Sequence, residues 1–135
     1  THPRWMSVCN QPAPDTGLGA KFSYAHVMAM AAHGLDTGDI AAFSDACARD
    51  PALVAFRARV HVVPDEGLSE MQARVEIDGV PHTHDLSAAL PYETRAARIH
   101  AKAGALVGAR AKVLWAAIEG GDVAGFARLL APEPV

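Results

Sequence analysis

The chain contains one stretch, residues 20–32, that is apolar almost all the way round a helix. Its few polar residues all lie near its start: Lys21, Ser23, Tyr24 and His26. A loop rich in proline and glycine precedes the stretch, and Gly34 follows it, where a glycine in the left-handed conformation commonly ends a helix. A helix that is apolar on most of its surface must be covered on more than one side, so we expect the chain to pack round it.

The polar start of this predicted helix indicates a site for an anion. Free backbone N–H groups and the positive end of the helix dipole favour negative charge there, and Lys21 and the Ser23 hydroxyl strengthen that preference. His26 lies three residues after Ser23, on the same helix face, and its ordinary pKa of about 6.5 suits proton transfer near neutrality. We therefore predict that Lys21, Ser23 and Tyr24 bind a substrate carboxylate and that His26 is catalytic, which requires Lys21 and His26 to face one opening.

The alternative for the same residues is structural. Ser23 would cap the helix, and His26 would be a buried histidine whose hydrogen bonds are satisfied inside the fold.

Size and composition exclude several classes of protein. A chain of 135 residues, half of them hydrophobic and 20% charged, fits one globular domain without disulfide or metal support. The net charge of −3 comes from mixed signs with no basic cluster, which argues against nucleic-acid or membrane-surface partners. No signal peptide and no apolar run long enough to cross a bilayer are evident. Cys9 and Cys47 have neither CxxC nor zinc spacing, so we expect a reduced, cytoplasmic protein.

The pattern of apolar residues predicts both strands and helices before residue 90. Alternation predicts strands over 4–9, 56–63 and 71–78, whereas helical spacing predicts helices over 38–49 and 51–56, the latter capped by Asp50. Asp78-Gly79 is a strong two-residue hairpin signal, so residues 80–85 should return antiparallel.

The predicted hairpin leaves the position of two histidines open. With a tight turn, His82 and His84 would oppose Val75 and Ala73 on the core face, whereas a loop one residue longer would turn them to solvent. A metal site of the two histidines with Asp85 is a weak alternative to ordinary surface residues, so we predict no metal.

Helices dominate the C-terminal part. A long amphipathic helix should follow Pro91 and end at Gly108, and two shorter helices should cover residues 109–119 and 122–130. The whole pattern predicts an α+β fold: a small, mainly antiparallel sheet of about three or four strands with helices packed on one face, plus C-terminal helices.

The segment DTGLGAKFSYAHVMAMAAHG, followed by SDACARDPAL and ARVHVV, resembles the C-terminal region of MmgE/PrpD proteins. That family usually has a Pro, a short spacer and Glu-Ala-Lys-Phe-Ser, with a Tyr or His three residues after the Ser. Here Lys21, Ser23 and His26 stand at the matching positions, and Gly19 replaces the usual Glu, which could otherwise orient Lys21.

The resemblance implies a domain organisation and an activity. Residues 1–108 would be the family's C-terminal α+β domain, and residues 109–135 a helical tail that packs on a separate helical domain. Family members, which include 2-methylcitrate dehydratase, cis-aconitate decarboxylase and iminodisuccinate epimerase, are lyases and isomerases that handle small di- or tricarboxylic acids without a metal or other cofactor. Because no stretch here matches the helical domain, which holds much of the acid/base machinery, we expect the isolated chain to be inactive.

Two other hypotheses come from different classes of protein. The chain could be a stand-alone module that binds a small ligand without chemistry. It could also be a homodimer held by exposed apolar side chains of its last helices, namely Trp115, Ile118, Phe126 and Leu129.

Overall fold

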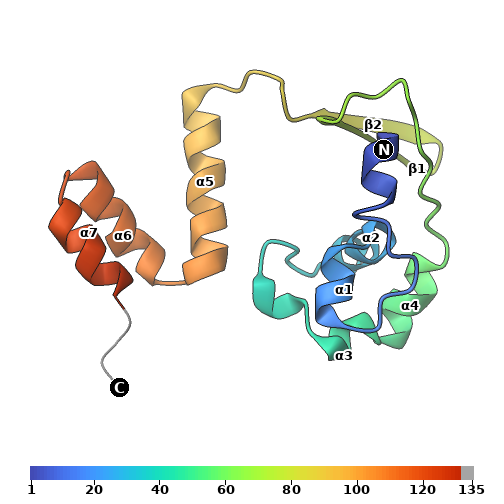
Figure 1. The fold of residues 1–135 in the computed structure, drawn as a ribbon, viewed down its shortest axis with the longest axis horizontal. Coiled ribbons are helices and arrows are strands. Elements are labelled where there is room, and N and C mark those ends of the chain that lie inside the picture. The colour runs from blue at the N-terminus through green and yellow to red at the C-terminus, as the bar shows by residue number, and fades with distance from the viewer. Residues whose placement is uncertain (132–135) are drawn as a thin grey trace. The chain divides into compact units, whose positions relative to one another are not determined.

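The computed structural model describes residues 1–131, whose elements fall into two units (Figure 1). The first unit, Thr1–Ala89, contains η1 (Pro3–Met6), α1 (Gly17–Lys21), α2 (Tyr24–Ala32), η2 (Ile40–Ala42), α3 (Asp45–Ala48), α4 (Pro51–Arg57), β1 (Gln72–Ile77) and β2 (Val80–Asp85). The second unit begins at Leu90 and contains α5 (Tyr92–Val107), α6 (Arg110–Glu119) and α7 (Val123–Leu130). The predicted α+β class is confirmed.

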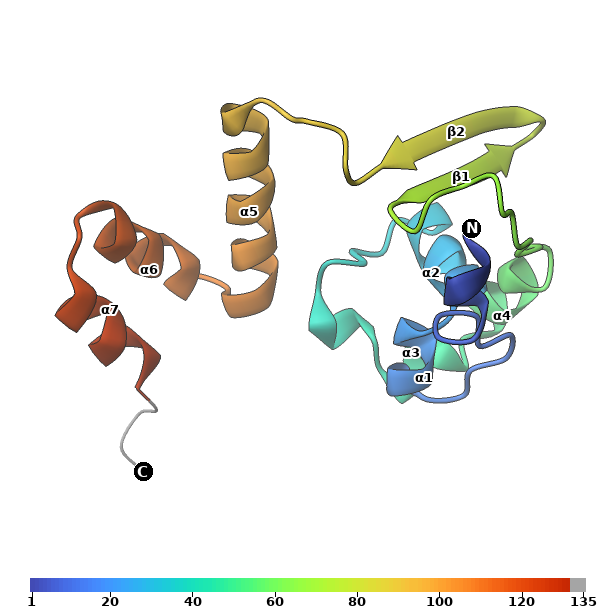
Figure 2. The same cartoon turned by 45° about the horizontal axis from the view of Figure 1, so that its top comes forward.

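The sheet is a single antiparallel hairpin, smaller than the predicted three or four strands (Figure 2). Asp78 and Gly79 both have positive φ, 50° and 79°, as a tight two-residue hairpin turn requires. The register pairs Val75 with His82 and places Pro81 opposite Glu76.

The histidines of β2 have the partners expected for a tight turn, but they do not reach a core. His84 is paired with Ala73, and both His82 and His84 are exposed. The question left open by the sequence is thus answered by a tight turn with both histidines exposed to solvent, because nothing covers that part of the hairpin among residues 1–131.

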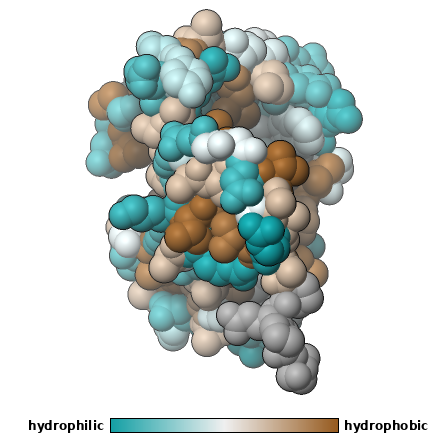
Figure 3. Space-filling view, turned by 90° about the vertical axis from the view of Figure 1, so that its left-hand side faces the viewer, coloured by the Kyte–Doolittle hydropathy of each residue, from teal (hydrophilic) through white to brown (hydrophobic). Residues whose placement is uncertain are grey.

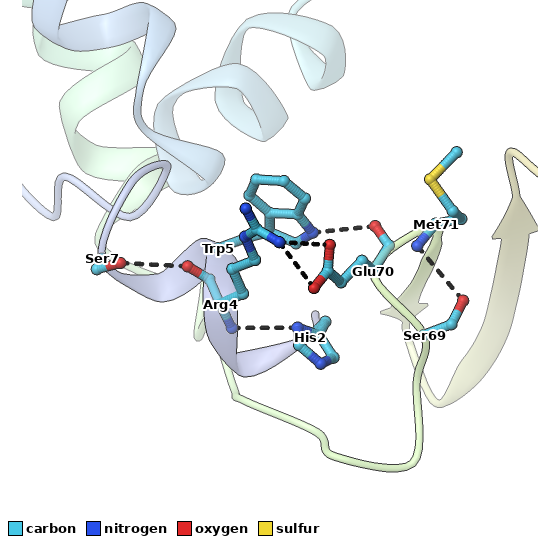
Figure 4. Close-up of polar contacts among 7 residues, drawn as sticks. All are labelled: His2, Arg4, Trp5, Ser7, Ser69, Glu70 and Met71. Carbon is cyan, nitrogen blue, oxygen red and sulfur yellow. Dashed lines mark hydrogen bonds and ion pairs between the residues drawn. The ribbon is translucent and has the colours of Figure 1, made fainter.

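The strand predicted over residues 4–9 is a short 3-10 helix instead. Pro3 stands in its first turn, where a missing N–H costs nothing, and the His2 side chain accepts a hydrogen bond from the backbone N–H of Arg4. Figure 4 shows Arg4 and Trp5 directed at Glu70: both Arg4–carboxylate contacts are about 3 Å, and the indole N–H donates to the Glu70 carbonyl at 3.0 Å. Local capping and contacts with a distant segment thus both favour this short helix over a strand.

The strand predicted over residues 56–63 is also absent. The predicted short helix is present as α4 and extends through Arg57, and no strand begins before Gln72. Helical spacing brings Phe56 onto the same core as Leu53, which strand geometry would not do.

The single helix predicted over residues 38–49 is divided into η2 and α3. Ser44 ends the run because its hydroxyl accepts from the backbone N–H of Cys47 at 3.1 Å and so begins a new helix.

The core of the first unit lies where α2 packs on α4. Ala29, Met30 and Leu53 are its buried centre, and Phe43 and Phe56 lie at its edge. Gly17 allows α1 to approach the chain just before α3 closely, because a Cβ there would collide with the carbonyl oxygen of Phe43. A small, close-packed helical cluster thus forms round α2, as its apolar sequence predicts.

The second unit is built from consecutive helix pairs, α5 with α6 and α6 with α7. Gly125 is the only buried residue of the three helices, and many large apolar side chains are exposed, as the apolar surface in Figure 3 illustrates. Among residues 1–131, no helix combines the length and the apolar character needed to cross a membrane.

Candidate functional site

The apolar stretch at the centre of the first unit is two helices rather than one. The chain turns at Phe22, and Ser23 begins α2 with its hydroxyl accepting from the backbone N–H of His26 at 3.2 Å. Backbone bonds join this turn to the preceding loop, from Gln11 N–H to the Phe22 carbonyl and from Tyr24 N–H to the Cys9 carbonyl. Backbone hydrogen bonds therefore hold the polar start of α2 against the loop that precedes α1.

His26 lies entirely inside the first unit, with 0% of its surface exposed. Its Nδ1 is 3.3 Å from Nη1 of Arg57, on α4, and its Nε2 is 3.9 Å from the sulfur of Cys47, on α3. Both ring nitrogens thus meet a side chain from another helix.

Burial and, to a smaller extent, the positive charge of Arg57 lower the pKa of His26 from its ordinary value. Burial and then the charge of Asp50 raise the pKa of the Cys47 thiol. The pair is therefore a neutral imidazole beside a neutral thiol at pH 7, unlike the thiolate–imidazolium pair of a cysteine nucleophile.

Arg57 is held at this position by backbone oxygens. Its Nη1 donates to the carbonyls of Pro14 at 2.8 Å and of Ala48 at 3.1 Å, in addition to its contact with His26. No carboxylate of the described residues forms an ion pair with it. The guanidinium therefore joins three segments, the loop before α1, the end of α3 and the first turn of α2.

Lys21 and Tyr24 have separate surroundings. Lys21, the last residue of α1, is exposed, and its ammonium lies 5.8 Å from the centre of the Phe43 ring. The Tyr24 hydroxyl is 3.4 Å from the hydroxyl of Thr1.

The structure brings Ser23 and His26 together but does not join Lys21 to them. Ser23 is 1% exposed, so neither it nor His26 lines an opening formed by residues 1–131. This arrangement is the one expected of a helix cap and a satisfied buried histidine, and a substrate could reach His26 only after the covering residues move.

Arg57 and Cys47 are the neighbours of His26 that sequence reasoning missed. Arg57 falls within the strand predicted over residues 56–63, whereas its position four residues after Leu53 on a helix capped by Asp50 turns it toward the core. The signals that could have corrected this are the Asp50-Pro51 helix start and the helical spacing that follows it.

Two other features bear on ligands. A surface cavity of about 450 Å³ lies between α5 and α6, lined by His100, Lys112 and Trp115 among others. Within the described part of the chain, no three His, Cys, Asp or Glu side chains gather in a way that could hold a metal ion.

Comparison with known proteins identifies the first hundred residues. The family model for the MmgE/PrpD C-terminal domain matches residues 1–100, a range that includes the whole segment from Lys21 to His26. No curated protein and no solved structure matches the chain.

Proposed function

The chain belongs to the MmgE/PrpD family, whose C-terminal domain it contains, and we propose on this premise that it is part of an enzyme acting on small di- or tricarboxylic acids. The reaction would be a dehydration, decarboxylation or epimerisation, each of which moves a proton or carboxyl group at a carbon next to a carboxylate. The observation that carries the proposal is the family match across Lys21, Ser23 and His26.

Each residue of the motif has a role in this proposal. Lys21 supplies an exposed ammonium for a substrate carboxylate, and Tyr24 supplies a second polar group, a hydroxyl that lies against Thr1 in this structure. Ser23 holds the first turn of α2, and His26 carries the proton. Its neutral imidazole has one unprotonated nitrogen, as a proton acceptor needs, but the ring is buried and one ring nitrogen faces Arg57, so the covering residues and Arg57 must move before it can accept a proton.

The partner in this proposal is the family's helical domain. Residues 109–135 would pack on that domain and residues 1–108 would meet the substrate. The exposed apolar side chains of α5–α7 support this assignment, because surfaces of that kind usually mark contacts with another protein surface.

Turnover assays with cis-aconitate and 2-methylcitrate test the function. We expect the chain of 135 residues to give no turnover alone and to become active when supplied with a family helical domain. In the assembled enzyme, His26→Asn should lower kcat by about 10²–10⁴-fold, the usual contribution of a general acid or base. His61→Asn, at an exposed position, is the matched control. Activity of the chain alone, or an active His26→Asn enzyme, contradicts the proposal.

The second candidate is a non-catalytic module that binds a small carboxylate or forms a homodimer. The complete burial of His26 and its satisfied ring nitrogens favour it. Calorimetric titration of succinate or citrate into the chain tests binding, and light scattering over a range of concentrations tests dimerisation.

A further inference from the structure

The contact between Arg57 and His26 fixes where the imidazole proton lies. A guanidinium only donates hydrogen bonds, so the nitrogen that faces it must accept. Nη1 of Arg57 has two hydrogens and three acceptors within reach, the carbonyl oxygens of Pro14 and Ala48 and, at 3.3 Å, Nδ1 of His26. Nδ1 shares one of these hydrogens, and an N–H on Nδ1 would instead face the guanidinium N–H groups, so the contact favours Nδ1 as the unprotonated nitrogen. The proton of the neutral ring lies on Nε2, which faces the Cys47 sulfur at 3.9 Å.

The contact between Arg57 and His26 is supported by further hydrogen bonds of Arg57. The same Nη1 is tied to two carbonyl oxygens, those of Pro14 and Ala48, which limits how far the guanidinium can turn away. Among the described residues no carboxylate pairs with Arg57 and competes for its hydrogen bonds. Its helix is anchored by the Asp50 cap and by Leu53 in the core.

The contact between His26 Nε2 and the Cys47 sulfur is weak. A thiol is a poor hydrogen-bond acceptor, and the long Nε2–sulfur distance agrees with a weak bond. The titratable or charged groups that meet the ring from α3 and α4 are Cys47 and Arg57, and Ser23 meets only the backbone of its own helix. An oxygen acceptor could thus replace the thiol at Nε2 far more easily than anything could replace the guanidinium at Nδ1.

We propose that Arg57 is a positioning residue for His26, one that holds the imidazole as the Nε2–H tautomer and so makes Nε2 the atom that faces a reaction partner. The tautomer assignment stands on the contacts alone, whereas its meaning for catalysis rests on the proposed role of His26. The positioned ring presents a hydrogen-bond donor at Nε2, and Nδ1 becomes a proton acceptor only when Arg57 withdraws.

Long-range proton–nitrogen NMR of the ¹⁵N-labelled chain tests the proposal, since it separates protonated from unprotonated ring nitrogens. In the wild-type chain at neutral pH we expect a single His26 form with the proton on Nε2. Arg57→Met removes the donor and should give a mixture of tautomers together with a rise in the pKa of His26. Arg57→Lys keeps a charged donor and should retain most of the Nε2–H form. Arg59→Met removes a guanidinium that lies against the Phe56 ring and should change neither property.

Two results overturn the proposal: a wild-type His26 protonated on Nδ1, or an Arg57→Met chain that keeps a single Nε2–H form. If Arg57→Met does not fold, the wild-type tautomer and the Arg57→Lys spectrum decide the question. Because no substrate enters this measurement, inactivity of the assembled enzyme would refute the proposed function without touching the role of Arg57.

Discussion

Helices α2 and α5 show two different ways in which a helix can be specified. The nine residues of α2 include four that are buried, whereas none of the 16 residues of α5 is buried within the described chain. The sequence of α5 has the clearer amphipathic stripe, yet Tyr92 on that stripe is 69% exposed. The spacing of apolar residues therefore predicts that a helix forms. Its apolar side stabilises the fold only where other parts of the protein pack against it. The first unit has that surface, and the second, as far as residue 131, does not.

The largest expected effect comes from emptying the core of the first unit. Met30→Ala should lower its free energy of unfolding by about 2–5 kcal/mol, because a fully buried side chain leaves a cavity. Leu106→Ala on α5 should cost about 0.5 kcal/mol or less, because that side chain is already exposed. Urea unfolding followed by Trp5 fluorescence, in a Trp115→Phe background, measures the first unit, and the converse background measures the second. Equal losses would contradict the contrast between the units.

Glycine substitutions should have opposite signs in the two units. Gly17→Ala places a methyl group against the Phe43 carbonyl and should destabilise the first unit by about 1–3 kcal/mol. Gly104→Ala on α5 meets nothing within 4 Å and should stabilise the helix by about 0.5–1 kcal/mol. Thermal unfolding of each variant measures both changes, and a stabilising Gly17→Ala would show that α1 does not approach α3 as closely as described.

Removing a helix cap should destabilise the helix that it begins in either unit. The Asp50 carboxylate accepts from the backbone N–H groups of Ala52 and Leu53, and Asp122 accepts from Gly125. Asp50→Ala should cost about 1 kcal/mol in urea unfolding. Asp122→Ala removes the same kind of cap from the less buried second unit, so circular dichroism should show a loss of helix. The unfolding midpoint of the first unit should not change. Asp50→Asn, which still caps, is the control.

The pH dependence of stability should come from the first unit and be the smallest effect. The pKa of His26 is lowered in the folded chain, so the unfolded chain binds more protons between that pKa and about 6.5. The free energy of unfolding should therefore decrease as the pH falls through this window. His26→Gln should flatten the dependence between pH 7 and 5 in urea titrations, and a slope unchanged by this substitution would assign the effect to another group.

Much of the fold could be predicted because its signals are local. Asp78-Gly79 gives the hairpin, the Asp50-Pro51 start gives α4, and Gly108 ends α5 with positive φ. These features depend on neighbouring residues alone, so the sequence is sufficient for them.

The two site residues that were missed, Arg57 and Cys47, meet His26 through contacts between separate segments of the chain. The divided helices have a local cause, because the hydroxyls of Ser23 and Ser44 begin new helices. Alternating apolar residues look alike in a strand and in a short helix, and the place of the Arg57 side chain depends on its contacts with the carbonyls of Pro14 and Ala48. The spacing of Ser23 and His26 correctly placed them together, but it did not reveal that the Ser23 cap breaks the helix or that Arg57 meets the ring.

The position of Pro81 has a consequence for how the hairpin behaves towards other chains. Pro81 stands next to the hydrogen-bonded pair that flanks the turn, opposite Glu76, so its nitrogen is directed away from β1. The outer edge of β2 consequently lacks a backbone N–H donor at its second residue. A strand from another chain that paired with this edge would lose one hydrogen bond. The β2 edge of this two-stranded ribbon is thereby made a poorer template for edge-to-edge aggregation.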